Sequence, residues 1–550
     1  MGYEPLHHAT PPAPPRRDDW WRGAVIYQIY PRSFQDSNGD GIGDLKGITA
    51  RLDHVAGLGV DAVWISPIFK SPMKDFGYDV ADYCAIDPIF GTLKDFDALR
   101  ERAHALGLKV LLDLVPAHTS SEHPWFKESR ASRDNLRADW YVWADARPDG
   151  SPPNNWLSVF GGVSWQWEQR RRQYYLHNFL KEQPQLNLHN PEVVEALLAA
   201  AQFWLERGVD GFRVDAVDWS VHDPKLRDNP PRRRAGVSSG SAAGSPFEMQ
   251  LQRYNKARPE LAELLLKPLN ALTERYGGRM LLGEISGEHA LRRAADYTSG
   301  GGLDMVYTFD LLTCPFTPGA LRAVGRTLGR SIENGWFCWS FANHDVRRPP
   351  SRFAGSEAPE GLRRLVPVLL CTLRGTLSIY QGEELGLEEA ELAHGELRDP
   401  FGIEFWPAFK GRDGARTPMP WHHAQPHGGF STAKPWLPLY RPHLVRAVDL
   451  QEQDPQSVLN TLRRFLAWRR QEPALRRGSM SFPRAGEKLL VVRREHEGRE
   501  ILAAFNMSGE PCVWQAPAAA VPAFACGGHD QRGRRFTLEP WSAVFLAHAA

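Results

Sequence analysis

The sequence has few cysteines and no long uninterrupted apolar run. Its 550 residues include six scattered cysteines without a CxxC pair, which predicts reduced core thiols in a cytoplasmic protein. No stretch offers about 18 consecutive apolar residues, and the Pro-rich start, residues 1–17, has no apolar signal segment. We therefore expect a protein that does not span a membrane and carries no standard export signal.

The chain also lacks an excess of charge of either sign. It has 66 basic and 65 acidic residues, a formal net charge of +1. Such balance gives no electrostatic reason to expect a nucleic acid or an acidic membrane as a partner. Aromatic residues are abundant instead. The 19 Trp residues, many beside Pro, Asp and Asn, offer ring faces on which sugars can stack, although filling a large core is the alternative use.

Three short apolar runs end in acidic side chains, at Asp215, at Glu284 and at Asp345. Because side chains alternate along a strand, Arg213 and Asp215 should share one face. An Arg in that position favours the ionised carboxylate that a nucleophile needs. A single acidic strand end is more often a helix cap or a surface residue, but three in one chain favour a shared site.

Short apolar runs followed by polar loops recur over most of the chain and alternate with amphipathic segments. This pattern predicts an α/β fold, a (β/α)8 TIM barrel whose catalytic groups lie at the C-terminal strand ends. The expected helices are residues 48–57, 191–207 and 259–276. The expected barrel strands are residues 24–30, 62–66, 110–115, 211–215, 280–284, 305–309, 336–343 and 377–380.

Two parts of the chain depart from this alternation. Trp, Pro, Asn and Gly interrupt it after the third strand for too long to form an ordinary loop, which predicts a small inserted domain. Short alternating strands near the end predict a C-terminal all-β domain. The expected division is a disordered leader over 1–19, the barrel over 20–117 and 189–478, the insert over 118–188 and a β-sandwich over 479–550.

These segments resemble, in order and spacing, the alpha-amylase superfamily of glycoside hydrolases, and within it the exo-acting α-glucosidase and oligo-1,6-glucosidase group. The resemblance extends from residue 20 into the C-terminal domain. Its motifs are Glu284 together with DLVPAH (113–118), QPQLN (183–187), GFRVD (211–215), FANHD (341–345), RGT (374–376), YQGEE (380–384), GRDG (411–414) and RTP (416–418).

The resemblance implies roles for the three carboxylates. Asp215 would be the nucleophile, Glu284 the acid/base, and Asp345 a third carboxylate that binds and distorts the sugar. A retaining mechanism needs one ionised and one protonated carboxyl group. We expect Arg213 to keep Asp215 charged, and the apolar residues before Glu284 to raise the pKa of that carboxyl.

The resemblance also implies which residues bind one glucose. His118 and His344 would hydrogen-bond its hydroxyl groups. Asp75 and Tyr78 would grip the non-reducing end, and with Arg412 they would close the pocket behind one sugar. A pocket closed in this way implies exo action, with one glucose released at a time.

Other positions bear on the bond that is cleaved. Phe160 and Phe179 occur where the group places aromatic residues beside that bond, with a core role in the insert as the alternative. Ala216, directly after Asp215, favours α-1,4 linkages, because Val there tends to accompany α-1,6 activity in the group. Two positions depart from the group's pattern: Ala117 stands where Asn is usual, and Gln185 where Asp is usual. These departures affect what is expected of the support of His118 and of the packing of the insert.

Residues 36–44 present oxygen ligands at alternate positions with Gly at the turn, like the first half of an EF-hand loop. Gly47 stands where an EF-hand would supply its bidentate Glu, so the loop is incomplete, and a Gly/Asp-rich turn is the alternative. The resemblance implies a structural Ca²⁺ or Mg²⁺ and no organic cofactor. The implied ligands are Asp36, Asn38, Asp40, the Ile42 carbonyl and Asp44.

The sequence thus predicts a retaining exo-acting α-glucosidase that releases terminal α-linked glucose, with α-1,4 maltose-like short substrates preferred and a covalent glucosyl-enzyme intermediate. Water or an alcohol would accept the glucose, and the enzyme would be a monomer or a homodimer. Alternatives on the same scaffold are an oligo-1,6-glucosidase and a sucrose hydrolase or isomerase, although the isomerases' RLDRD pentapeptide is absent. The alternative from another class is a non-catalytic sugar-binding or transporter-associated relative.

Overall fold

The computed structural model describes residues 19–232, 245–287, 290–298, 301–331, 336–518 and 521–549. The expected disordered leader lies outside the described residues except for its last position. Part of the Pro-, Arg- and Ser-rich segment before Pro246, positions 233–244, also lies outside them.

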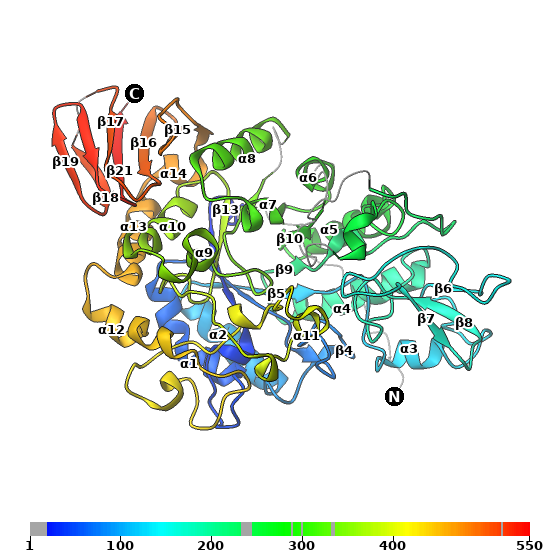
Figure 1. Cartoon of the computed structure of the whole chain (residues 1–550). Helices are drawn as coiled ribbons and strands as arrows, with labels where there is room; N and C mark the ends of the chain where they lie inside the picture. The colour runs from blue at the N-terminus through cyan, green and yellow to red at the C-terminus, as the bar shows by residue number, and fades with distance from the viewer. Residues whose placement is uncertain are drawn as a thin grey trace.

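Eight parallel strands form the barrel that the sequence predicts (Figure 1). Their hydrogen-bonded order is β11-β10-β9-β5-β2-β1-β13-β12, and a parallel bridge between Val306 and Phe337 joins the two ends of the row. The strands are β1 (Val25–Ile29), β2 (Ala62–Ile65), β5 (Lys109–Leu114), β9 (Gly211–Val214), β10 (Met280–Ile285), β11 (Met305–Thr308), β12 (Cys338–Trp339) and β13 (Thr376–Tyr380).

Most helices surround the barrel, and one short helix, Pro124–Ser129, belongs to the insert. Side-chain caps define the N-terminal ends of several of them; Asp44, for example, accepts the backbone N–H of Gly47 at the start of α1. The helices are α1 (Leu45–Gly57), α2 (Leu93–Ala105), α3 (Pro124–Ser129), α4 (Pro191–Glu206), α5 (Lys267–Arg275), α6 (Ala290–Thr298), α7 (Phe309–Thr313), α8 (Pro318–Ser331), α9 (Pro349–Ala354), α10 (Glu360–Leu370), α11 (Pro400–Phe405), α12 (Val448–Gln453), α13 (Val458–Gln471) and α14 (Pro473–Arg477).

Two predicted elements differ in extent. The helix expected over 259–276 consists of a π-helical turn, Ala262–Leu266, followed by α5. The strand expected over 336–343 was wrong beyond Trp339, because residues 340–343 do not pair with a neighbouring strand. The chain leaves the sheet there in a turn in which the Ser340 hydroxyl donates to the Ala342 carbonyl, and this turn leads to His344 and Asp345.

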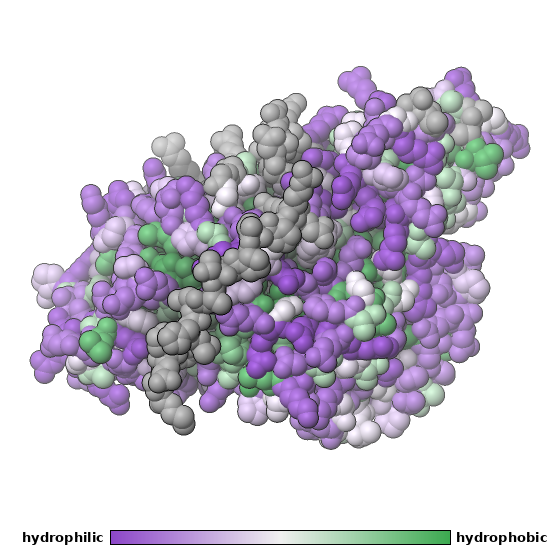
Figure 2. Space-filling view, turned by 180° about the vertical axis from the view of Figure 1, so that it is seen from behind, coloured by the Kyte–Doolittle hydropathy of each residue, from purple (hydrophilic) through white to green (hydrophobic). Residues whose placement is uncertain are grey.

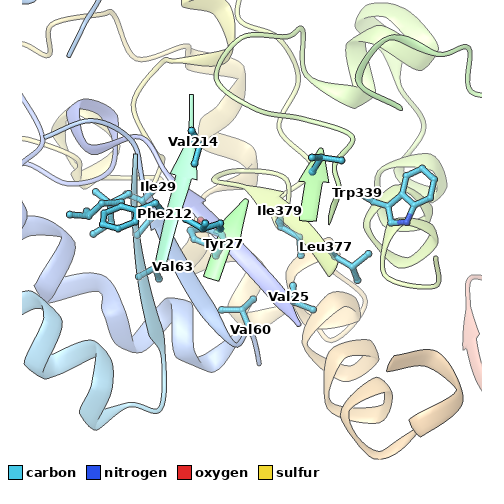
Figure 3. Close-up of a cluster of buried hydrophobic side chains, with 14 of the residues drawn as sticks. Val25, Tyr27, Ile29, Val60, Val63, Phe212, Val214, Trp339, Leu377 and Ile379 are labelled. Atoms are coloured by element: carbon cyan, nitrogen blue, oxygen red, sulfur yellow. The ribbon is translucent and has the colours of Figure 1, made fainter. Parts of the chain in front are cut away.

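Alternation along the barrel strands separates two apolar layers. Side chains such as Val25, Val63 and Phe212 point outward and pack against the helices (Figure 3). The intervening residues, including Trp64 and Leu282, point inward and fill the barrel. Polar residues of the same inward set follow nearer the strand ends, so the barrel has an apolar floor below a polar mouth.

The insert and the C-terminal domain are built from antiparallel sheets and lie on opposite sides of the barrel in Figure 1. The insert contains β6 (Trp143–Ala144), β7 (Trp165–Glu168) and β8 (Gln173–Leu176); β3 (Phe69–Lys70) and β4 (Asp82–Ile86) form a separate pair. The C-terminal sheets pack on one apolar cluster and comprise β14 (Ser479–Ser481), β15 (Leu489–His496), β16 (Arg499–Asn506), β17 (Cys512–Gln515), β18 (Pro522–Cys526), β19 (His529–Arg532), β20 (Arg535–Leu538) and β21 (Ala543–Ala549).

The face of the molecule shown in Figure 2 is mostly hydrophilic, and its apolar side chains form small separate patches. None of the helices in the described part of the chain combines the length and the apolar character that a membrane crossing requires.

Candidate active site

A cavity of about 1020 Å³ lies at the polar mouth of the barrel. Residues from the ends of β9 and β10, from the loops that follow other barrel strands and from the insert line it. It brings together every predicted catalytic and substrate-binding residue except Arg213, which lies buried behind the wall. The predicted lining residues are Asp75, Tyr78, His118, Phe160, Phe179, Asp215, Ala216, Glu284, His344, Asp345 and Arg412.

Arg213 connects the strand-end carboxylates. Its guanidinium is fully buried and pairs with Asp215, with Asp113 at 2.8 Å and with Glu284 at 2.8 Å. The sheet register explains the arrangement, because Arg213 stands opposite Asp113 on β5 and Leu282 on β10. Glu284 is two residues beyond Leu282 and therefore points to the same side. One guanidinium thus holds three carboxyl groups from three adjacent strands.

These three carboxyl groups share a single positive charge. Burial raises the pKa of Asp215 well above its usual value, the charges of Glu284 and Asp113 act in the same direction, and Arg213 opposes them. Burial likewise raises the pKa of Asp113 to about 6. The direction of this shift is opposite to the expectation that Arg213 keeps Asp215 charged. Three buried carboxyls around one guanidinium favour retention of a proton, which the coupled set would share rather than one residue hold.

Glu284 does not have the apolar surroundings that the preceding residues suggested. The Tyr307 hydroxyl donates to its Oε1 at 2.9 Å, and the backbone N–H of Ala216 donates to its Oε2 at 3.1 Å. Tyr307 also accepts a hydrogen bond from Arg213 at 2.8 Å. The carboxyl of Glu284 is therefore held in place by a hydroxyl, an amide and a guanidinium.

The turn after the β9 strand directs this amide. Ala216 has φ 38° and ψ 41°, the left-handed conformation, which costs about 1–2 kcal/mol for a residue with a side chain. The chain reverses there, so that the amide next to Asp215 faces Glu284 while the Ala216 methyl lines the cavity. A backbone turn thus joins the two candidate catalytic carboxyls.

Arg412 closes the other end of the cavity. Its guanidinium contacts Asp75 at 2.9 Å, Asp345 at 3.2 Å and Asp399 at 2.8 Å, and Arg416 contacts Asp345 at 3.0 Å. Burial alone would raise the pKa of Asp345, but its electrostatic interactions with the His344 ring and with the charged Arg412 and Arg416 together outweigh burial and hold the pKa far below its usual value. Asp345 is therefore ionised at neutral pH.

Two neutral histidines flank the space between these groups. Burial lowers the pKa of His118 to about 4 and that of His344 to about 3. The Gln28 amide nitrogen lies 2.8 Å from Nδ1 of His344, whose ring stacks on Tyr78 at 5.3 Å between centroids. The Gln183 amide nitrogen lies 3.1 Å from Nε2 of His118. Uncharged rings fixed in this way can exchange hydrogen bonds with sugar hydroxyls.

Aromatic side chains form the wall beside Asp215. Phe160 and Phe179 both line the cavity and pack with ring centroids 5.9 Å apart. Phe179 also contacts Trp219 at 5.7 Å, and Phe160 contacts Phe401 at 4.9 Å. The two phenylalanines thus belong to an apolar cluster and to the cavity wall at once. Gln185, a departure from the usual pattern, supports this wall by donating to the Trp219 carbonyl at 3.0 Å.

Several residues of the site were not identified from the sequence. Tyr307 lies inside a predicted strand, and its inward position opposite Glu284 follows from the alternation once the register is known. Asp113 and Arg416 belong to recognised motifs, but the neighbouring sequence does not show which side chains they contact. Gln183 bonds both Asp75 and His118. Asp399 carried no signal, because its contacts with Arg412 depend on how a long loop folds.

The predicted ion-binding loop has its carboxylates directed at backbone groups. Asp36 accepts N–H bonds from Asn38, Gly39 and Gly41, and Asp44 accepts the N–H groups of Ser37 and Gly47. Within the described residues, no group of three or more His, Cys, Asp or Glu side chains gathers closely enough to hold a metal. Ion binding through Asp36, Asn38, Asp40, Ile42 and Asp44 stays a prediction.

Sequence and structure comparisons identify the class of protein. The family model described as alpha amylase, catalytic domain, matches residues 28–478. A probable alpha-glucosidase of Rhizobium meliloti (strain 1021) is 56% identical over 91% of this chain and 91% of its own. An oligo-1,6-glucosidase of Heyndrickxia coagulans is 35% identical over 96% of this chain and 99% of its own.

A solved structure agrees with these relatives. The crystal structure of the alpha-glucosyl transfer enzyme XgtA superposes with a TM-score of 0.93 at 52% identity and covers 98% of this chain and 100% of its own. The chain belongs to the alpha-amylase family. It is an enzyme with the glycoside hydrolase activity that its relatives and its retained carboxylates support.

Proposed function

We propose that this enzyme is a retaining exo-acting α-glucosidase that releases terminal α-linked glucose from short, maltose-like α-1,4 substrates and can transfer it to alcohols. The observation that carries the proposal is the buried Arg213, which holds Asp215 and Glu284 side by side at the end of a closed pocket. Two adjacent carboxyl groups are what a retaining mechanism requires.

In the first step, Asp215 attacks the anomeric carbon and Glu284 protonates the leaving oxygen. The coupled carboxyl group supplies the proton, because three carboxyls share one guanidinium. With substrate bound, we assign this proton to Glu284, which lies toward the leaving group, and the negative charge to Asp215, which remains paired with Arg213. The bond to the leaving oxygen breaks as the bond from Asp215 to carbon forms.

In the second step, Glu284 acts as the base. It removes a proton from water or from an alcohol, whose oxygen displaces Asp215 from the anomeric carbon. Two displacements at the same carbon restore the α configuration. The relative XgtA, named as an alpha-glucosyl transfer enzyme, supports an alcohol as the second acceptor.

The closed end supports exo action. Arg412 bridges Asp75 and Asp345, and we infer that this bridge bounds the pocket behind one terminal sugar and blocks the passage of a longer chain. Fixed negative charge on Asp345 and hydrogen bonds from His118 and His344 would hold the hydroxyls of that sugar. We base the preference for α-1,4 linkages on Ala216, as the resemblance implied. The H. coagulans relative is named an oligo-1,6-glucosidase, so α-1,6 activity is the alternative.

A product-resolved assay tests the proposal. Wild-type protein and Asp215→Ala would be compared on maltose, isomaltose, sucrose and maltotetraose by measuring free glucose and the anomer released first. We expect rapid release of α-glucose from maltose by the wild type and none by the variant. First release of β-glucose would overturn retention, and faster release from isomaltose or sucrose would overturn the assigned linkage.

Absence of sugar release from every substrate would overturn the hydrolytic assignment and favour a binding role.

Cytoplasmic location and a monomeric or homodimeric state stay predictions from the sequence.

A further inference from the structure

The mouth of the cavity differs in charge from its base. Acidic residues dominate the base, where Asp75, Asp215, Glu284 and Asp345 surround the proposed glucose position. Beyond the base, the lining contains seven Lys and Arg side chains and two acidic ones, Glu389 and Glu391. The basic residues there are Arg232, Arg253, Lys256, Arg293, Arg347, Arg352 and Lys410.

Carboxylates behind the lining pair with part of this positive charge: Asp218 lies 3.2 Å from Arg293 and 3.7 Å from Lys256, and Glu248 lies 4.0 Å from Arg232. The two acidic residues of the lining compensate little of the remaining charge. Glu391 pairs with Lys410 at 2.5 Å, so that these two charges cancel. Glu389 is oriented by the backbone N–H of Arg348 at 2.8 Å, and burial raises its pKa to about 7. Glu389 therefore carries only part of a negative charge near neutral pH.

Arg253 and Arg347 are the exposed cations of this rim. Arg253 comes from the loop after β9 and Arg347 from the loop after β12, and both line the cavity. Among the described residues, neither guanidinium has an ion-pair partner; the contact found for Arg253 is a distant one with the Tyr254 ring, 5.9 Å from its centroid. Arg253 thus stands at the entrance without a counter-ion, and Arg347, from a different loop, interacts there with the partly charged Glu389.

A third cation lies deeper, on an aromatic wall. Lys256 is buried, its Nζ donates to the Ser286 hydroxyl at 2.6 Å, and it lies 4.4 Å from the centroid of the Trp219 ring. Phe247 packs beside Trp219 at 6.1 Å and also lines the cavity. The space beyond the catalytic carboxyls therefore has apolar ring faces with positive charge beside and outside them.

We propose that this mouth selects leaving groups and acceptors that carry an anionic group on an apolar ring, such as a carboxylated phenol, with Arg253 and Arg347 holding the anion. The ring would lie against Trp219 and Phe247, where its apolar faces leave water. The carboxylate would reach the rim, where charge complementarity favours it over a neutral group of the same size. This inference rests on the proposed glucosidase function.

The test compares two matched substrates, 4-carboxyphenyl and 4-carbamoylphenyl α-glucopyranoside, which differ in charge at one position. The kcat/KM of each would be measured for wild type, Arg253→Gln, Arg347→Gln and the double variant at low and high salt. Because each substrate serves as its own reference across the variants, the different leaving abilities of the two phenols cancel.

We expect the double variant to lose about three- to tenfold in kcat/KM for the carboxylated substrate, the range expected of two partly exposed ion pairs, and less than twofold for the amide. Raising the salt concentration should reduce the wild-type preference in the same way. Arg170→Gln is the matched control, because Arg170 is exposed on the insert and is not part of the cavity lining. This variant should leave kcat/KM unchanged for both substrates.

Equal losses on both substrates, or no loss on either, would overturn the inference. If the wild type still released glucose from the 4-carbamoylphenyl substrate, the proposed glucosidase function would be unaffected by that outcome. Failure of the wild type to cleave either glucoside would count instead against the glucosidase assignment, so the two failures can be told apart.

Discussion

The two ends of the glucose pocket are built from the same residue types in different proportions. At the strand ends, three carboxyls (Asp113, Asp215 and Glu284) surround one guanidinium. At the closed end, the three carboxyls of Asp75, Asp345 and Asp399 contact the two guanidinium groups of Arg412 and Arg416.

This difference determines what each end can do. With two arginines nearby, the pKa values of Asp345 and Asp399 fall below their usual range although burial opposes the shift. The third carboxyl of this end, Asp75, has a raised pKa, because burial outweighs the same two arginines there. With one arginine, the pKa of Asp215 rises. Fixed charge suits binding and orientation, whereas a retained proton suits acid/base catalysis. The second arginine thus favours ionised Asp345 and Asp399 at the binding end, whereas a single arginine at the reacting end does not lower the pKa of Asp215 below its usual value.

The largest expected effect follows from removing the acid at the reacting end. Glu284→Gln keeps the size of the side chain and its neighbours, but an amide cannot donate the required proton. We expect kcat on maltose to fall by about 10²–10⁴-fold. An aryl glucoside with an easily expelled phenol needs little protonation, so its first step should be far less affected. Stopped-flow release of the phenol would measure that step, and equal losses on both substrates would contradict the assignment.

A smaller loss is expected at the binding end. Arg412→Lys keeps one positive charge but cannot reach Asp75, Asp345 and Asp399 together, because the planar fork is lost. Losing buried hydrogen bonds to charged groups costs about 1.5–3 kcal/mol, so we expect kcat/KM for maltose to fall about 10- to 100-fold, mainly through KM. Initial rates over a range of maltose concentrations would separate the two constants. A fall confined to kcat would place Arg412 in the chemical step instead.

The neutral histidines give the pocket a pH-dependent stability. The pKa of His118 is about 4 in the folded protein because of burial, against an unfolded value near 6.5. Its contribution to stability is therefore complete above about pH 6.5 and is lost as the pH falls toward 4. We expect the free energy of unfolding to drop by roughly 1.6 kcal/mol from this residue between pH 6.5 and 5.

Denaturant unfolding at several pH values would measure that drop. His118→Gln cannot titrate, so its unfolding free energy should vary less over the same interval. A variant with unchanged pH dependence would show that other groups dominate acid unfolding.

Tyr307 allows a finer test of the reacting end. Its hydroxyl donates to Glu284 and therefore favours the ionised carboxyl. In Tyr307→Phe this support is lost, the proton is held more tightly, and the basic limb of the kcat/KM profile should move upward by about half to one pH unit. A pH series on maltose would measure the shift, with kcat reduced about tenfold or less. A downward shift would contradict the role given to Tyr307.

The barrel and much of the pocket could be predicted from sequence because strand periodicity is local. Arg213 and Asp215 share a face by alternation, and their position at a strand end places them at the mouth. The same rule failed after Trp339, where apolar residues continue but the backbone turns out of the sheet. Composition cannot distinguish a strand from an apolar turn that serves a site.

The charge distribution could not be predicted, because it depends on pairings between distant segments. Arg412 meets Asp75 across 337 positions of the chain, and Asp399 joins them only when a long loop folds back. The sequence also suggested an apolar setting for Glu284 from its neighbours along the strand. Its actual partner, Tyr307, comes from the adjacent strand and depends on register.

The smallest effect on activity is expected at the loop that contains Asp36 and Asp40, because the cavity lining does not include it. An ion bound there would stabilise the folded state without taking part in the reaction. An ion present at 100 times its dissociation constant contributes about 2.7 kcal/mol, which corresponds to a Tm increase of about 2 °C in a protein of this size. We therefore expect chelation to lower Tm by about 2 °C and Ca²⁺ or Mg²⁺ to restore it.

Thermal unfolding of chelated and ion-supplemented protein would measure the shift, while maltose assays on the same samples at 25 °C should agree within about twofold. Asp40→Ala removes an exposed carboxylate of the loop and should abolish the Tm response. Asp530→Ala, an exposed carboxylate in the C-terminal domain, should preserve it. An unchanged Tm after chelation would show that the backbone hydrogen bonds of Asp36 and Asp44 hold the loop without an ion, and that the Gly/Asp-rich turn was the correct alternative.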